Sequence, residues 1–171
     1  MRIVIAGGRT LAVRVLEALA ADGHEIVGVW TEEDDKLEGV AHSKGLPALI
    51  EPNVGDLAAL EPDLLLSVHN FRYIAPEFLR VPTMGALGYH PSLLPRHKGN
   101  DSVRATIEAG DRVAGGSVYW LDEGFDTGPV WRQERVEVHE RDDASTLWRD
   151  KLFPMGVRML RECVAELGGT R

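Results

Sequence analysis

His90 is a residue of this sequence whose position suggests a chemical role. It follows the largely apolar segment 84–89 and directly precedes Pro91. Because proline fixes φ and lacks a backbone donor, a strand rarely continues through it. We therefore predict that His90 ends a strand and that its imidazole lies beyond the strand's end. Imidazole gains and loses a proton near neutral pH, so this position suits acid–base chemistry.

A loop rich in carboxylates provides a possible partner for this histidine. The apolar run 116–121 is followed by residues 122–128, which include three acidic residues and two glycines. A histidine and a carboxylate at neighbouring strand ends can transfer protons together. The sequence therefore predicts an acid–base pair, provided that the fold brings the two segments together.

The elements around these segments alternate between apolar runs and amphipathic stretches, which is typical of an α/β fold. We predict strands at 3–6, 26–30, 64–68, 116–121 and 129–138, besides the one ending in His90. Predicted helices are 11–21, 40–44, 76–79, 103–109 and 144–167, with Pro154 kinking or splitting the last. A strand–helix–strand start indicates a parallel sheet with ligands at the carboxyl ends of its strands. We expect one domain, residues 1–171, with a mostly parallel, twisted, Rossmann-like sheet flanked by helices.

Composition and charge exclude several classes of protein. The chain has 171 residues and a net charge of −8, and no short window gathers the Lys and Arg that nucleic-acid binding needs. Its one cysteine, Cys163, rules out an internal disulfide and fits a reducing compartment. The apolar run at the N-terminus is too short for a signal peptide or a membrane span. We expect a cytoplasmic protein without nucleic-acid or membrane partners.

Two other chemistries have weaker support in the sequence. Gly7 and Gly8 after the first strand suit a phosphate or nucleotide, but the third glycine of the dinucleotide fingerprint is missing, and a tight structural turn explains them equally well. His69, His90 and His97 match no common zinc spacing, so we predict no metal site.

The residues 90–95, Gly99 and 122–130 together resemble the formyltransferase family that uses 10-formyltetrahydrofolate. The family includes glycinamide ribonucleotide formyltransferase, the catalytic domain of methionyl-tRNA formyltransferase and the sugar N-formyltransferases. The similarity extends to residues 62–66, to residues 71–74 and to the helix with Pro154, so that it covers nearly the whole chain. It implies the formyltransferase fold and 10-formyltetrahydrofolate as co-substrate.

The resemblance also implies roles for individual residues. His90 corresponds to the catalytic histidine, which stabilises an oxyanion, and Asp126 to the catalytic aspartate, which holds the imidazolium charge and helps to move a proton. Two segments correspond to the pterin pocket. The first, which acts largely through its backbone, is Phe71, Arg72, Tyr73 and Ile74. The second is the loop that closes over the pocket, with Asp122, Glu123, Gly124 and Phe125.

One position departs from the family pattern. Gly88 stands where the family has an asparagine, whose amide donates to the oxyanion, and losing such a donor costs about 3–4 kcal/mol. Asn70 or Asn100 could supply the amide instead, or the glycine could make room for a bulkier substrate while a backbone N–H binds the oxyanion. A third explanation is that the protein has lost transferase activity. We favour the first two together, since His90 and Asp126 are both present.

The expected acceptor is a small amine: an amino sugar, an amino acid derivative or another biosynthetic amine. Residues 7–10 do not match the family's phosphoribosyl site, and the short acidic chain makes tRNA an unsuitable substrate. The alternatives are a 10-formyltetrahydrofolate hydrolase and a non-catalytic folate- or nucleotide-binding module. The sequence is compatible with a homodimer.

Overall fold

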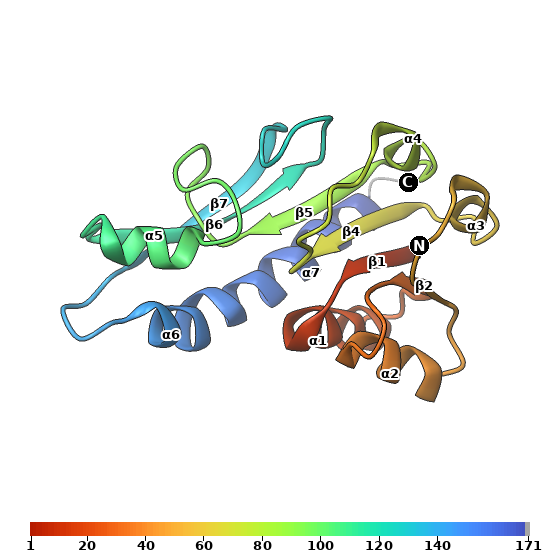
Figure 1. Cartoon of the computed structure of the whole chain (residues 1–171), viewed down its shortest axis with the longest axis horizontal. Helices are drawn as coiled ribbons and strands as arrows, with labels where there is room; N and C mark the ends of the chain where they lie inside the picture. The colour runs from red at the N-terminus through yellow and green to blue at the C-terminus, as the bar shows by residue number, and fades with distance from the viewer. Residues whose placement is uncertain (170–171) are drawn as a thin grey trace.

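The computed structural model describes residues 1–169, and a sheet of seven strands runs through this part of the chain (Figure 1). The strand order is β3-β2-β1-β4-β5-β6-β7, in which the first five strands are parallel and β6 and β7 are antiparallel to their neighbours. The strands are β1 Arg2–Gly7, β2 Glu25–Trp30, β3 Ala48–Leu49, β4 Leu64–Val68, β5 Ala86–His90, β6 Val113–Trp120 and β7 Val130–Glu137. The predicted α/β fold with a mostly parallel sheet is confirmed.

Helices cover both faces of the sheet because its central strands are apolar on both sides. In β1, Ile3 and Ile5 pack with α1 and α7, whereas Val4 and Ala6 pack in a second cluster with residues of α3 and α4. Figure 1 shows α1, α2 and α7 together on one side of the sheet. The helices are α1 Arg9–Ala21, α2 Lys36–Ser43, α3 Val54–Ala58, α4 Pro76–Leu79, α5 Ser102–Glu108, α6 Ala144–Leu147 and α7 Phe153–Gly169, and a π-helix spans Trp148–Leu152.

Helix boundaries differ from the sequence predictions by up to four residues, and the largest shift is at the start of α2. The helix expected at 40–44 begins at Lys36, because the Asp35 side chain accepts a hydrogen bond from the Leu37 amide and caps it. The helix expected at 144–167, which Pro154 was predicted to kink or split, is interrupted by the π-helix just before that proline. Proline has no amide to donate to the preceding turn, which accounts for the irregular hydrogen bonding there.

The direction of β6 changes how the carboxylate loop reaches the site. Leu87 pairs with Trp120 and His90 with Ser117, so β6 ends beside the beginning of β5. Residues 122–128 therefore begin at the opposite edge of the sheet from the end of β5. The loop then turns back over the sheet until Asp126 lies beside His90.

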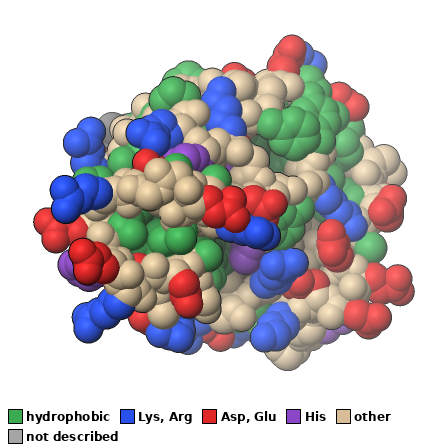
Figure 2. Space-filling view, turned by 60° about the vertical axis from the view of Figure 1, so that its left-hand side comes forward, with side chains coloured by type: hydrophobic (Ala, Val, Ile, Leu, Met, Phe, Trp, Pro, Cys, Tyr) green, Lys and Arg blue, Asp and Glu red, His purple; other side chains and the backbone are tan. Residues whose placement is uncertain are grey.

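Charged side chains of both signs are interspersed over the face seen in Figure 2. Within residues 1–169, no helix is long and apolar enough to cross a membrane.

Candidate active site

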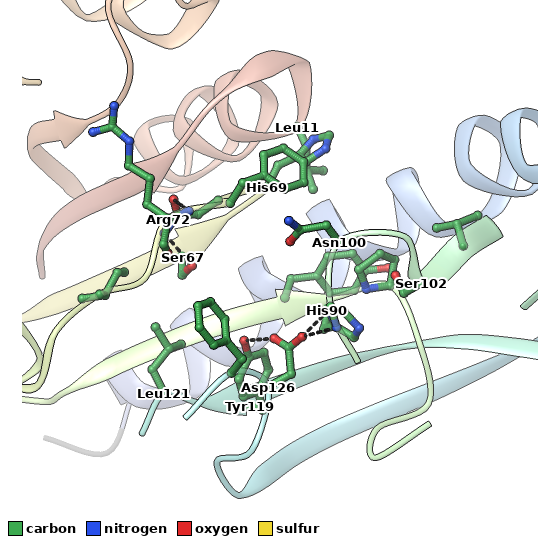
Figure 3. A pocket seen from close by; sticks show the side chains of 18 of the residues that line it. Leu11, Ser67, His69, Arg72, His90, Asn100, Ser102, Tyr119, Leu121 and Asp126 are labelled. Carbon is green, nitrogen blue, oxygen red and sulfur yellow. Dashed lines mark hydrogen bonds and ion pairs between the residues drawn. The ribbon is translucent and has the colours of Figure 1, made fainter. Parts of the chain in front are cut away.

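A cavity of about 420 Å³ opens where β4 and β5 end. Its walls come from the segments after β4 and β5, the loop after β6 and the α6–π-helix region. Figure 3 shows His90, Tyr119 and Asp126 together at one side of this space and His69 and Leu11 at another. The lining includes the predicted residues His90, Asp126, Asn70, Asn100, Phe71, Arg72, Tyr73, Ile74, Asp122, Gly124 and Phe125.

His90 is held by oxygen atoms at both ring nitrogens. Its Nε2 lies 2.8 Å from the His97 carbonyl, and its Nδ1 lies 3.5 Å from Asp126 Oδ2. Since a carbonyl only accepts, Nε2 carries a proton, and a ring protonated at both nitrogens can donate in both directions. The contact to Asp126 is too long for a strong hydrogen bond, so Nδ1 keeps the capacity to donate to a substrate oxygen.

Asp126 is fixed by two hydrogen bonds besides its contact with His90. Its Oδ2 accepts from the Gly99 amide at 2.8 Å and its Oδ1 from the Tyr119 hydroxyl at 2.7 Å. The carboxylate is only 14% exposed. The backbone of Asp126 has φ 52°, in the left-handed region that non-glycine residues rarely occupy. The loop thus keeps a strained conformation that aims this carboxylate at His90.

Tyr119 lies where a side chain at position 88 would lie. Gly88 pairs with Tyr119 across β5 and β6, and a Cβ at Gly88 would be 3.0 and 3.1 Å from atoms of the tyrosine ring. It would also be 2.9 Å from Leu121 Cδ1. Burial, with the hydrogen bond to Asp126 as a second cause, raises the pKa of the Tyr119 phenol. The phenol therefore stays a neutral donor to the carboxylate.

The two asparagines occupy different environments. The Asn70 side chain binds its own loop, with Nδ2 donating to the Arg72 carbonyl and Oδ1 accepting from the Arg72 amide. Asn100 lines the cavity and makes no side-chain hydrogen bond to the described residues. Of the two, Asn100 is the one with an amide available to a ligand, and its role stays a prediction.

The predicted pterin-side residues are joined across the cavity mouth. The Tyr73 hydroxyl donates to the Glu123 carbonyl at 2.9 Å, and the rings of Tyr73 and Phe125 lie 5.3 Å apart. Asp122 accepts from the Thr127 hydroxyl and the Gly124 amide, and these bonds lower its pKa, the first more strongly. Phe125 is 63% exposed, so the loop presents an aromatic ring that a bound ligand could cover.

The structure adds cavity residues for which the sequence predicted no function. His69 follows β4 with its ring 5.1 Å from Phe71 and 5.3 Å from Trp148, and Arg9 lies over Phe71 at 4.9 Å. Burial lowers the pKa of His69, and the charge of Arg9 adds to this. The position of His69 after a strand indicated that it points past the sheet edge, but no pattern links Trp148 to it. Within residues 1–169, no group of His, Cys, Asp and Glu side chains could hold a metal ion.

A family model described as formyl transferase matches residues 48–160. The cytosolic 10-formyltetrahydrofolate dehydrogenase of Xenopus laevis is 33% identical over 96% of this chain, which spans only 20% of that protein's length. The methionyl-tRNA formyltransferase of Pseudomonas paraeruginosa is 31% identical over 98% of the chain and 59% of its own length.

Solved structures share the fold. Phosphoribosylglycinamide formyltransferase from Bacillus halodurans superposes with a TM-score of 0.88 and 24% identity, covering 98% of this chain and 95% of that one. Glycinamide ribonucleotide transformylase 1 from Symbiobacterium toebii gives a TM-score of 0.84 at 25% identity, covering 95% and 84%.

Proposed function

This chain belongs to the formyl transferase family, and on that premise we propose that it transfers the formyl group of 10-formyltetrahydrofolate to the amine of a small molecule. One observation carries the proposal: His90, at the end of β5, and Asp126, in the loop after β6, meet at the same cavity. A protonated imidazole beside a carboxylate is suited to acyl transfer to nitrogen.

The reaction assigns a task to each group. The amine attacks the formyl carbon, a C–N bond forms, and the formyl oxygen becomes an oxyanion that accepts a hydrogen bond from His90 Nδ1. Asp126 takes a proton from the attacking nitrogen, and the C–N10 bond then breaks as that proton passes to the leaving tetrahydrofolate. Because Nε2 is held by the His97 carbonyl, the imidazole keeps a fixed orientation throughout.

The donor is proposed to bind between the backbone of Arg72–Ile74 and the loop Asp122–Phe125. The Tyr73 hydroxyl bond to Glu123 and the Tyr73–Phe125 ring contact support this, since they bring the two segments to one side of the cavity. A flat heterocycle fits such a site through ring contacts and backbone hydrogen bonds. We propose the cytoplasm as the compartment, on the basis of the buried free thiol of Cys163.

The direct test combines binding and turnover. Calorimetric titration with a stable folate analogue should give binding to the wild type, and a panel of amines with 10-formyltetrahydrofolate should release tetrahydrofolate with at least one amine. His90→Ala and Asp126→Asn should abolish turnover while retaining analogue binding. His42→Ala, an exposed residue of α2, is the matched control. Absence of analogue binding by a folded wild type would contradict the proposal.

Hydrolysis of the same donor is the second candidate. The relatives named 10-formyltetrahydrofolate dehydrogenase are named for this donor and not for an amine acceptor, which supports a reaction of the donor that needs no amine. Formate produced at the full rate without any amine would select this reaction. If neither reaction is observed, the remaining alternative is a non-catalytic folate- or nucleotide-binding module.

A further inference from the structure

The turn between β1 and α1 lies beside the cavity, at the place where α/β proteins commonly bind phosphate. In such folds the amides at the start of the first helix point at the anion. Gly8 precedes α1, and Arg9, its first residue, lines the cavity. The turn is therefore the natural position for a phosphate on a substrate that enters the cavity.

Here a carboxylate of the protein already occupies that position. The Arg9 amide donates to Asp35 at 2.9 Å (Oδ1) and 3.1 Å (Oδ2), and the Leu37 amide donates to Oδ1 at 2.7 Å. One aspartate thus caps α2 and also satisfies the amide at the start of α1. A Cβ at Gly8 would be 2.7 Å from Asp35 Oδ2, which shows how closely the carboxylate packs on the turn.

A phosphate at this turn would meet both the bulk and the charge of Asp35. Of the other charged groups nearby, Arg72 is paired with Glu32 at 3.6 Å, and the Arg9 guanidinium lies over the ring of Phe71. Like charges at such short range repel strongly when they are partly shielded from water. The turn therefore disfavours a dianion.

The rest of this side of the cavity is aromatic. The His69 ring contacts the rings of Phe71 and Trp148, with centroid separations of 5.1 and 5.3 Å, and buried Leu11 lies in the same wall. Figure 3 shows Leu11 and His69 at the opposite side of the cavity from Asp126 and Tyr119. Such a wall favours a flat or apolar substrate body.

We propose that the acceptor is an amine with an apolar or aromatic body and no phosphate, and that Asp35 is the residue that rejects phosphorylated amines. The inference rests on the proposed function. It separates this chain from its structural neighbours, which are named for a ribonucleotide acceptor.

Inorganic phosphate tests the role of Asp35 without any assumption about catalysis. In the wild type, the amide resonance of Arg9 should show no saturable change during a phosphate titration followed by nitrogen–proton NMR. Asp35→Ser keeps a capping side chain for α2 but removes the charge. In this variant the Arg9 amide should respond with saturation in the millimolar range. Asp35→Asn is the second variant if the serine protein unfolds, and Glu33→Gln, an exposed acid of the same loop, is the control.

A saturable phosphate response in the wild type would overturn the inference. So would its absence in folded Asp35→Ser and Asp35→Asn, because the turn would then not be a suppressed anion site.

Substrate selectivity tests the rest of the inference. Pairs of amines that differ only by a phosphate should be formylated in favour of the unphosphorylated member. Asp35→Ser should narrow that preference by about tenfold or more, as expected when a charge repulsion is removed. A wild-type preference for the phosphorylated members would contradict the inference. If no amine is formylated, the proposed function fails, and the phosphate titration still decides the role of Asp35.

The aromatic wall has a test of its own. Among unphosphorylated amines, those with aromatic bodies should have the lower KM. Trp148→Ala should raise that KM and leave the KM for the formyl donor unchanged. Equal KM values for aromatic and aliphatic amines in the wild type would contradict this part of the inference.

Discussion

Three side chains form a connected series at the centre of this protein. The Tyr119 hydroxyl donates to Asp126, and Asp126 faces the ring of His90. The Tyr119 hydroxyl is thus directed at the aspartate. Its effect on any reaction therefore passes through the orientation of the carboxylate, which makes it a positioning residue.

Tyr119→Phe should lower kcat about tenfold to a hundredfold. The substitution removes a hydrogen bond to an ionised group, a bond of about 1.5–3 kcal/mol, but keeps the ring. The KM for the formyl donor should not change. Steady-state kinetics with His42→Ala, an exposed residue of α2, as control would check this. An unchanged kcat in Tyr119→Phe would mean that the Gly99 amide alone orients the carboxylate.

Gly88→Asn should lower the free energy of unfolding by about 1–3 kcal/mol, because its Cβ would overlap the Tyr119 ring and Leu121. Combining it with Tyr119→Ala should restore part of the loss, with a coupling energy of about 0.5–3 kcal/mol. Urea unfolding of the two single variants and the double variant measures this coupling. Additive effects would show that the ring moves aside at no cost.

The sequence predicted part of this site and missed the rest for a physical reason. His90 and Asp126 follow apolar runs and belong to a specific paired motif, so their types and neighbours identify them. Tyr119 belongs to a strand whose residues look like ordinary core, and only the folded structure shows its hydroxyl at Asp126 and its ring beside Gly88. Which residues of two strands pair with each other cannot be predicted from the sequence of either strand alone when the strands are distant in the chain.

At the scale of elements, Tyr89 joins β5, which ends in His90, to the π-helix Trp148–Leu152. Its hydroxyl donates to the Leu152 carbonyl at 2.7 Å from within the core, where the residue is 6% exposed. Cβ atoms at Gly116 and Gly156 would both lie 2.5 Å from the same ring. The two glycines therefore allow α7 and β6 to approach β5 closely, and Trp148 reaches the cavity from the adjoining π-helix.

Tyr89→Phe should lower the free energy of unfolding by about 1–3 kcal/mol, because it leaves the Leu152 carbonyl without this donor in the core. Denaturant unfolding of the variant beside Tyr73→Phe, whose hydroxyl is at the surface, would measure the difference. Equal stability of the two variants would indicate that the carbonyl finds another donor.

The elements themselves were predicted better than their directions. Strand 64–68 and helix 76–79 have the predicted bounds to within a residue, since buried apolar runs and a first-turn proline define them locally. The antiparallel direction of β6 was not predicted, because an apolar strand can have the same sequence pattern whether it pairs with its neighbours in parallel or antiparallel.

At the scale of the whole molecule, the burial of His69 makes folding sensitive to pH. Its pKa is lowered from 6.5 in the folded state, mainly by burial and then by Arg9. Below that ordinary value the unfolded chain binds a proton that the folded chain does not bind, so stability falls as the pH decreases. The effect of this histidine begins above the pH range in which the surface carboxylates are protonated.

The melting temperature should therefore fall between about pH 7 and about pH 5. His69→Gln should reduce this dependence, whereas His42→Gln, on the exposed side of α2, should not. Thermal unfolding at several pH values would test it. His24 has a lowered pKa from partial burial as well, so some dependence should remain in His69→Gln. An identical slope in wild type and His69→Gln would contradict the assignment.

The contact between Gly88 and Tyr119 also limits how this protein could have diverged. A larger residue at position 88 costs less stability once position 119 has become smaller, so the order in which mutations arise affects which of them survive. Ancestors and descendants of this chain should therefore have exchanged the two positions as a pair, and lineages with a bulky residue at both should be missing.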